Sequence, residues 1–253
     1  MAHRSSRNQR EARPVHVLLA FINEALRAPA SRYNQRMAAS SALPPALSGD
    51  VTALVLAGGR GSRMGGVDKG LQPFQGQPLA QRALQRLQQQ TLPPAAVLLN
   101  ANRHLAEYRA FGVPVWPDEL PDFAGPLAGF LTGLAHCRTP LLLTLPCDVP
   151  HFPPTLCERL AQALQSQQAD IAVAAAPDED GQLRPQPVFS LLRASLLPSL
   201  QRFTAAGGRK VEAWTAQQRR VLVPFDAPGD DPRAFANANT LAELRALEPH
   251  EPS

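Results

Sequence analysis

The sequence predicts an α/β fold: one domain with three layers, in which a mostly parallel sheet lies between helices on both sides. Short apolar, β-rich segments alternate five times with amphipathic helical segments, which is typical of βαβ units. The segment "PLLLTLP" (140–146) is apolar at nearly every position and therefore suits a strand covered on both faces. No repeat and no linker interrupts the chain after residue 50, which favours a single domain.

The elements of the first half follow in order. Residues 51–57, "VTALVLA", are predicted to form the first strand because Val, Thr and Leu dominate them. Residues 78–90 are predicted to be a helix, since Pro78 suits a first turn and apolar residues share one face: Leu79, Ala83, Leu84 and Leu87. Further strands are expected at 95–100, 113–116, 140–146 and 170–176, and further helices at 103–112, 126–137 and 153–168.

The second half has a different pattern. A strand at 185–192 follows the turn "DEDG", and two helical segments then lead to the apolar run "RRVLVPF" (219–225). A last helix is expected over "TLAELRAL", where Thr240 and Glu243 have the spacing of a capping box.

Residues 1–50 differ from the body of the chain. They hold seven arginines and three acidic residues, which accounts for the whole net charge of +4. One amphipathic helix fits residues 15–28, but nothing around it would build a core. We therefore interpret residues 1–50 as a basic, disordered extension, residues 51–248 as the domain and 249–253 as a tail; an organelle transit peptide is the alternative for the N-terminal part.

Composition excludes several function classes. The body of the chain has no net charge, which argues against a nucleic-acid surface. No apolar run approaches the roughly 20 residues of a membrane span. The three cysteines, Cys137, Cys147 and Cys157, lack a C-x-x-C pair, which favours reduced thiols and a cytoplasmic protein.

A glycine-rich segment, "LVLAGGRGSRMGGVDKG" (54–70), comes directly after the first strand. Its six glycines allow backbone N–H groups to approach an anion, at the sheet edge where open parallel sheets bind ligands. Arg63 and Lys69 add charges that suit phosphate oxygens. Lys69 is one of only two lysines in the chain, which indicates that a lysine is required there.

This segment matches neither of two common phosphate-binding motifs. A Walker A motif counted from Gly61 reaches Gly66, but Val67 stands where lysine is needed. The dinucleotide-binding motif counted from Gly59 and Gly61 would need a glycine where Met64 stands.

Polar residues follow the next strands. Asp148 comes after the buried strand 140–146 and could bind Mg²⁺ together with phosphate oxygens, or else cap the helix that begins near Pro153. Asn100 and Asp118 end or follow two other strands, and each could close a turn or contact a ligand.

The glycine-rich segment resembles the first motif of the molybdenum cofactor guanylyltransferases, which are MobA-like nucleotidyltransferases with a Rossmann-like sheet. Later segments resemble the same family in order: "NANRH" (100–104), "DELPDFAGPLAG" (118–129), "LPCDVP" (145–150), "GGRKV" (207–211) and "FANANTLAEL" (235–244). The similarity extends over about residues 51–247.

The resemblance implies that GMP is transferred from GTP to molybdenum-molybdopterin, with Mg²⁺, giving molybdenum-molybdopterin guanine dinucleotide and pyrophosphate. It implies catalytic roles for Arg63, Lys69 and Asp148, with Asp148 also the metal ligand. It implies GTP binding by Leu56, Ala57, Gly58, Lys69, Asn100, Asp118 and Asp148. Gly59 and Gly125 are further candidates near the nucleotide, and Asn237 and Asn239 are either structural or line the acceptor side. Cofactor-delivery proteins or molybdoenzymes are the expected protein partners, without nucleic acid or membrane.

Two other functions stay open on the sequence. One is the same chemistry with another nucleotide or acceptor, as in cytidylyl- or sugar-phosphate nucleotidyltransferases, although the "LAGG" and "PCD" segments favour the guanylyl branch. The other is a nucleotide-binding chaperone module without catalysis, which we would expect to lack Lys69 or Asp148; both are present.

Overall fold

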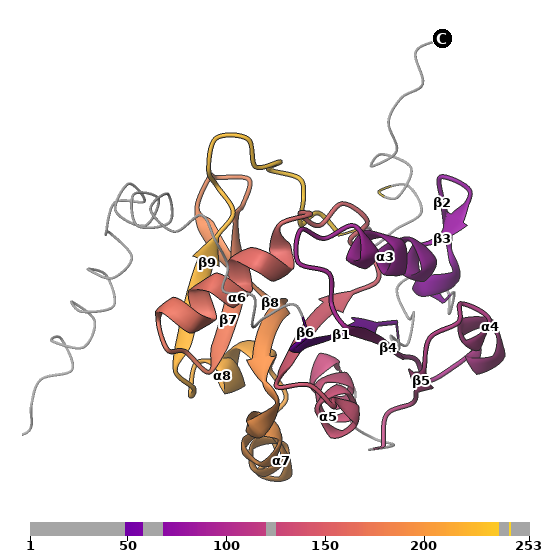
Figure 1. Cartoon of the computed structure of the whole chain (residues 1–253), viewed down its shortest axis with the longest axis horizontal. Coiled ribbons are helices and arrows are strands. Elements are labelled where there is room, and N and C mark those ends of the chain that lie inside the picture. Colours follow the sequence, from indigo (N-terminus) through magenta and orange to yellow (C-terminus); the bar gives the residue numbers. More distant parts are fainter. Residues whose placement is uncertain (1–48, 58–67, 120–124, 238–242, 244–253) are drawn as a thin grey trace, which may run out of the picture. The chain divides into compact units, whose positions relative to one another are not determined.

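A computed structural model describes residues 49–57, 68–119, 125–237 and 243. Its main sheet has seven strands in the order β5-β4-β1-β6-β8-β7-β9 (Figure 1). Strand β8 runs antiparallel to β6 and β7, and every other neighbouring pair is parallel. The strands are β1 (Val51–Leu56), β4 (Ala96–Asn100), β5 (Val115–Trp116), β6 (Leu141–Pro146), β7 (Ile171–Pro177), β8 (Leu183–Arg193) and β9 (Arg220–Pro224). The mostly parallel sheet predicted from the alternating pattern is confirmed.

Helices cover both faces of the sheet, which confirms the three-layer arrangement. Figure 1 shows α3 and α6 on one side and α5, α7 and α8 on the other. The helices are α3 (Leu79–Gln88), α4 (Leu105–Arg109), α5 (Pro126–His136), α6 (Leu156–Ser166), α7 (Leu197–Ala205) and α8 (Val211–Thr215). Leu54 and Leu142 of the central strands pack with Phe130 of α5 and Trp214 of α8 in one core, and all four side chains are fully buried.

A two-stranded hairpin precedes α3 and was not expected from the sequence. It consists of β2 (Pro73–Phe74) and β3 (Gln77–Pro78). Gln75 and Gly76 between them have φ values of 50° and 77°, the left-handed conformation that a two-residue hairpin turn needs. Pro78 belongs to β3 and is the N-cap of α3, so its predicted place in the first turn of the helix was wrong by one position.

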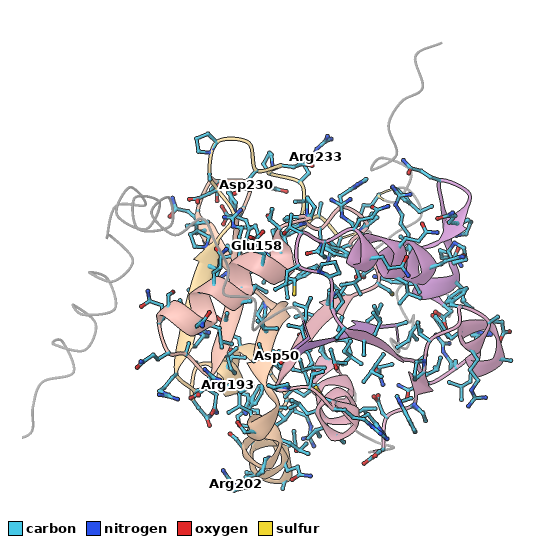
Figure 2. All side chains as sticks on the ribbon, in the orientation of Figure 1. Asp50, Glu158, Arg193, Arg202, Asp230 and Arg233 are labelled. Atoms are coloured by element: carbon cyan, nitrogen blue, oxygen red, sulfur yellow. The ribbon has the colours of Figure 1, made fainter. Side chains whose placement is uncertain are left out.

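The segment after β9 is held to α6 by one arginine. The guanidinium of Arg159 makes two hydrogen bonds to the carboxylate of Asp230, of 2.8 and 3.0 Å, and a third to the carbonyl of Pro224. The same guanidinium lies 3.9 Å from the centre of the Phe225 ring. Figure 2 labels Asp230 on this segment and Glu158, the neighbour of Arg159, on α6.

Several sequence predictions concern residues outside the described part of the chain. They are the basic extension with its helix at 15–28, most of the last helix with its capping residue Thr240, and the tail. The domain boundaries proposed from the sequence therefore stay predictions. Within the described residues, no helix combines the length and the apolar character that a membrane span requires.

Candidate functional site

Lys69 and Asp148 meet at the carboxyl edge of the sheet. Strands β1 and β6 are parallel neighbours, with Leu56 paired to Pro146, so the segments that follow them emerge side by side. The ammonium Nζ of Lys69 lies 3.0 Å from Oδ2 of Asp148, and the two side chains are 25% and 18% exposed. Two of the three predicted catalytic residues are therefore in contact.

The capping alternative for Asp148 is wrong. Helix α6 begins at Leu156, its N-cap is Thr155, and no side chain makes a capping hydrogen bond there. The carboxylate of Asp148 instead binds Lys69.

Side chains of α3 and of the residues just after it hold the segment that follows Asp148. Arg86 donates hydrogen bonds to the carbonyls of His151 and Phe152. Gln90 donates to the carbonyl of Pro153 and accepts from the backbone N–H of Cys157, both at 3.0 Å. These contacts tie the segment between Asp148 and α6 to α3 and the residues just after it, on the same side of the sheet.

Asn100 and Asp118 are also in contact. Asn100 is the last residue of β4 and 3% exposed, and its amide donates to Oδ1 of Asp118 at 2.9 Å. Asn102, which the sequence analysis did not single out, donates to Oδ2 of Asp118 at 2.7 Å and accepts from the backbone N–H of Asp118 at 2.7 Å. Two asparagines thus orient the Asp118 carboxylate. The spacing N-A-N in "NANRH" is the sequence signal that could have identified Asn102.

An aromatic stack adjoins this pair of residues. The ring of Trp116 lies parallel to that of His136 at the end of α5, with 3.6 Å between the ring centres. The imidazole Nε2 of His136 is also 3.8 Å from Oε1 of Glu119. His136 therefore contacts residues on both sides of Asp118 in the chain.

The other predicted nucleotide-binding residues are divided between described and undescribed parts of the chain. Leu56 is the last residue of β1 and Ala57 follows it; the backbone N–H of Ala57 donates to the carbonyl of Asn100 at 2.8 Å. Asn237 is described and exposed. Gly58, Gly59, Arg63 and Asn239 lie outside the described residues.

Two glycines at the start of α5 serve different purposes. Gly125, the N-cap, has a φ of 127°, which side chains disfavour. A Cβ built on it would meet no described protein atom within 4 Å, so its predicted closeness to the nucleotide stays a prediction. Gly129 is the residue that permits close packing, because a Cβ there would lie 2.4 Å from Leu56 Cδ2 and 2.7 Å from Asn100 Oδ1.

A buried polar cluster lies directly before Lys69 in the chain. Asp68 is 7% exposed, and its Oδ1 accepts hydrogen bonds from the hydroxyl of Tyr108 at 2.5 Å and the backbone N–H of Gly70 at 3.1 Å. Burial, and then the proximity of Cys147 and Asp68, raise the pKa of the Tyr108 hydroxyl, which keeps it protonated. Burial and the charges of Asp148 and Asp68 raise the pKa of the Cys147 thiol. The sequence analysis missed both Asp68 and Tyr108.

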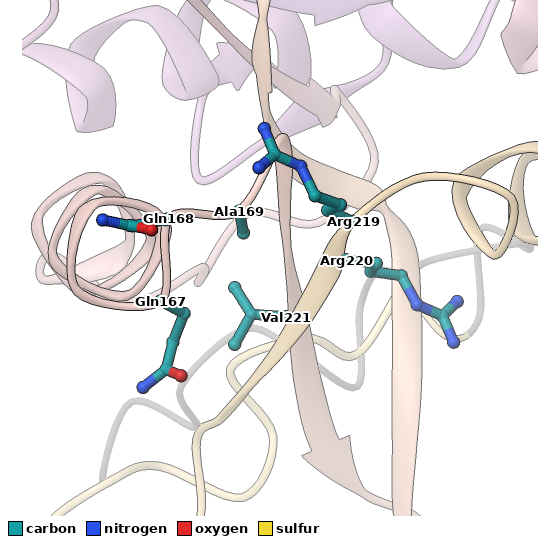
Figure 3. Close-up of a pocket in the computed structure, with 6 residues that line it drawn as sticks. All are labelled: Gln167, Gln168, Ala169, Arg219, Arg220 and Val221. Carbon is teal, nitrogen blue, oxygen red and sulfur yellow. The ribbon is translucent and has the colours of Figure 1, made fainter.

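A surface hollow of about 390 Å³ lies elsewhere (Figure 3). It is lined by Gln167, Gln168, Ala169, Arg219, Arg220 and Val221. These residues follow α6 or begin β9, so the hollow is at the amino ends of the strands, opposite the edge that carries Asp148. The guanidinium of Arg219 is bound by both carboxylate oxygens of Asp170, at 2.7 and 2.8 Å. The hollow is therefore separate from the candidate site.

The comparison with known proteins identifies the family of the chain. Residues 53–247 match the model of a family described as the MobA-like NTP transferase domain. A protein of Acidovorax sp. (strain JS42) named molybdenum cofactor guanylyltransferase is 64% identical over 204 residues, which cover 79% of this chain and 95% of that protein.

Two solved structures share the fold at low sequence identity. Molybdopterin-guanine dinucleotide biosynthesis protein A from Archaeoglobus fulgidus superposes with a TM-score of 0.60 and 20% identity, covering 77% of this chain and 95% of that one. 4-Diphosphocytidyl-2C-methyl-D-erythritol synthase from Anaerococcus prevotii superposes with a TM-score of 0.61 and 10% identity, covering 79% and 94%. From the family match over most of its length and this close relative, we conclude that the chain belongs to the family of MobA-like NTP transferases.

Proposed function

We propose that this protein transfers GMP from GTP to molybdenum-molybdopterin and releases pyrophosphate. The observation that carries the proposal is the contact between Lys69 and Asp148 at the sheet edge where Asn100 and Asp118 also lie. The relative at 64% identity, which carries the name guanylyltransferase, supports GTP as the nucleotide. The structural likeness to a diphosphocytidyl synthase concerns the fold alone and gives no support to CTP.

The reaction requires two anions to be held in line. An oxygen of the acceptor's terminal phosphate would form a bond to the α-phosphorus of GTP, while the bond from that phosphorus to the bridging oxygen breaks and its electron pair leaves with pyrophosphate. The attacking oxygen is already negatively charged, so no strong general base is needed. Catalysis then comes mainly from positioning and from neutralising charge.

Each proposed residue has a role in that step. The ammonium of Lys69, with the guanidinium of Arg63, would neutralise the triphosphate and then the departing pyrophosphate. The backbone of Leu56 and Ala57, together with Asn100 and Asp118, would hold the nucleoside. Asn237 and Asn239 would contact the acceptor.

Asp148 is suited to bind a magnesium ion together with phosphate oxygens of the substrate. Lys69 binds one of its carboxylate oxygens, and among the described residues no group of three or more acidic, histidine or cysteine side chains could hold a metal by itself. Mg²⁺ commonly uses one or two carboxylates together with phosphate oxygens, which is the donor set that Asp148 and a triphosphate would supply. When bound, the ion would withdraw negative charge from the reacting phosphate.

The three cysteines are all free thiols, of which Cys147 and Cys157 are buried. This state fits a reducing compartment and supports our proposal that the protein is cytoplasmic.

The test is incubation of the protein with molybdenum-molybdopterin, Mg²⁺ and each of GTP, CTP, ATP and UTP in turn. We expect guanine dinucleotide and pyrophosphate from GTP and no product from the other three. Transfer from CTP alone would overturn the guanylyl assignment. Binding of GTP without transfer to any acceptor would favour the chaperone alternative.

A further inference from the structure

Tyr108 has no assigned part in the reaction, yet it contacts the residue next to Lys69. It belongs to the short helix α4, forty residues further along the chain than Asp68. Its side chain is fully buried, and its hydroxyl donates to Oδ1 of Asp68 at 2.5 Å. A buried hydroxyl that reaches a buried carboxylate makes a strong, directional hydrogen bond.

The Asp68 carboxylate also fixes the main chain on the far side of Lys69. The oxygen that accepts from Tyr108 accepts from the backbone N–H of Gly70 at 3.1 Å. Asp68 is thereby the N-cap of the short 3-10 helix Lys69–Leu71. Residues on both sides of Lys69 are held by one carboxylate, and that carboxylate is held by Tyr108.

Gly70 is shaped to admit the Tyr108 hydroxyl. A Cβ built on Gly70 would lie 2.3 Å from the hydroxyl oxygen and 3.2 Å from Cε1 of the same ring. Any larger residue at position 70 must displace the tyrosine. The glycine and the tyrosine thus form one arrangement rather than two independent features.

We propose that Tyr108 is a positioning residue for Lys69: through Asp68 it fixes the backbone from which the lysine ammonium reaches Asp148 and, in the reaction, the phosphates. This inference rests on the proposed function, because it assigns Lys69 a role in GMP transfer. A lysine side chain is long and flexible, so a fixed backbone is needed to restrict where its ammonium can point.

The test compares three variants by steady-state kinetics with GTP and by thermal unfolding. Tyr108→Phe removes the hydroxyl and keeps the ring. We expect kcat to fall about tenfold or more because the ammonium is misplaced at the reacting centre, while KM for GTP changes by less than about twofold. Gly70→Ala, which displaces the hydroxyl, should lower kcat in the same way. It also provides an independent test if Tyr108→Phe fails to fold.

The double variant Tyr108→Phe/Gly70→Ala makes the test specific. The factor by which kcat falls in the double variant should be clearly smaller than the product of the factors in the two single variants. The reason is that phenylalanine at position 108 no longer places an oxygen where the new Cβ of residue 70 lies. Thr52→Val is the matched control. Its buried hydroxyl bonds Thr139 at 2.8 Å at the amino end of β1, so its loss should lower the melting temperature and leave kcat unchanged.

Four results would overturn the inference. They are a wild-type kcat in Tyr108→Phe, a loss of melting temperature alone, a rise in KM with kcat unchanged, and single losses that multiply in the double variant. If wild type and Thr52→Val transfer GMP and Tyr108→Phe does so with the same kcat, only this inference is wrong. If wild type itself transfers no GMP, the proposed function is wrong and the inference falls with it.

Discussion

Lys69 and Asp148 are 79 residues apart in the chain, yet 3.0 Å separates Nζ of one from Oδ2 of the other. Both side chains are largely shielded from solvent, so their attraction is screened less than that of a surface ion pair. In the absence of nucleotide each therefore compensates the charge of the other. Substitution of either residue by an uncharged one is expected to remove this attraction at the sheet edge.

Lys69→Arg should lower turnover strongly although it conserves the charge. The guanidinium is broader than the ammonium that fits beside Asp148, so the triphosphate should be displaced, and such a displacement can cost about a hundredfold in rate. Lys69→Ala should be at least as damaging. Steady-state rates with GTP decide the point, and an arginine variant that equals wild type would show that any cation serves at this position.

Asp148→Asn should abolish turnover and leave the fold intact. The amide is nearly isosteric with the carboxylate, but it lacks the charge that we propose binds Mg²⁺ and that balances Lys69. Rates measured over a range of Mg²⁺ concentrations, with circular dichroism as the check on folding, test this expectation. Wild-type activity of the variant at limiting Mg²⁺ would contradict the metal assignment.

Gly129→Ala should weaken GTP binding and stability together. Its Cβ would press on Leu56 and Asn100, and we expect the free energy of unfolding to fall by about 1–3 kcal/mol through overpacking, with a raised KM for GTP. Gly133→Ala is the control on the same helix, because the atoms nearest to its Cβ would belong to the core residues Leu54 and Leu142. Gly133→Ala should lower the free energy of unfolding by a similar amount and leave the KM for GTP unchanged. Equal changes of KM in both variants would mean that the effect does not pass through Asn100.

Asn102→Ala should raise the KM for GTP about fivefold, since it removes hydrogen bonds that orient the proposed ligand Asp118, worth about 1 kcal/mol. Asn102→Asp should be worse, because it places a second negative charge against the Asp118 carboxylate. Initial rates over a range of GTP concentrations give the KM for GTP of each variant. An aspartate variant that binds GTP better than the alanine variant would argue against this orienting role.

Asp170→Asn should remove a pH-dependent contribution to stability. Hydrogen bonds from Arg219, with the charges of Arg219 and Arg193, hold the pKa of the Asp170 carboxyl below its usual range. Because the pKa of Asp170 is lower in the folded than in the unfolded protein, the carboxylate stabilises the fold at pH values above the unfolded pKa of about 3.9. This stabilisation is lost as the pH falls through the pKa of the folded state. Because Arg219 is largely exposed, we expect the free energy of unfolding of Asp170→Asn at pH 7 to be only about 0.5 kcal/mol below that of wild type.

Urea unfolding of wild type and Asp170→Asn at pH 7 and near pH 2 measures this difference. The two proteins should differ at pH 7 and converge at the acid end, and 1 M salt should reduce the gap at pH 7. A gap that persists unchanged at low pH would mean that packing, and not the ion pair, is responsible.

Much of the fold could be predicted from local patterns in the sequence. The alternation of apolar runs and amphipathic segments identified most strands of the main sheet, the helices on its two faces and the layers, because a parallel sheet must be covered on both faces; it did not identify the hairpin of β2 and β3. The glycine-rich segment after the first strand and the rarity of lysine indicated Lys69. The positions of Asp148, Asn100 and Asp118 after strands made them candidates, and the resemblance to the family favoured their roles as ligands over roles in caps or turns. These signals are local, or repeat with the period of a helix or strand.

Only the tertiary structure decided which of these residues meet. The pairing of Lys69 with Asp148 depends on β1 and β6 being parallel neighbours in the sheet. The link from Tyr108 to Asp68 depends on where α4 packs, because the two residues are 40 positions apart in the chain. The demand for glycine at position 129 depends on how closely α5 packs on β4. Contacts between residues far apart in the chain leave no periodic signal in one sequence, because they depend on the order and spacing of the packed elements.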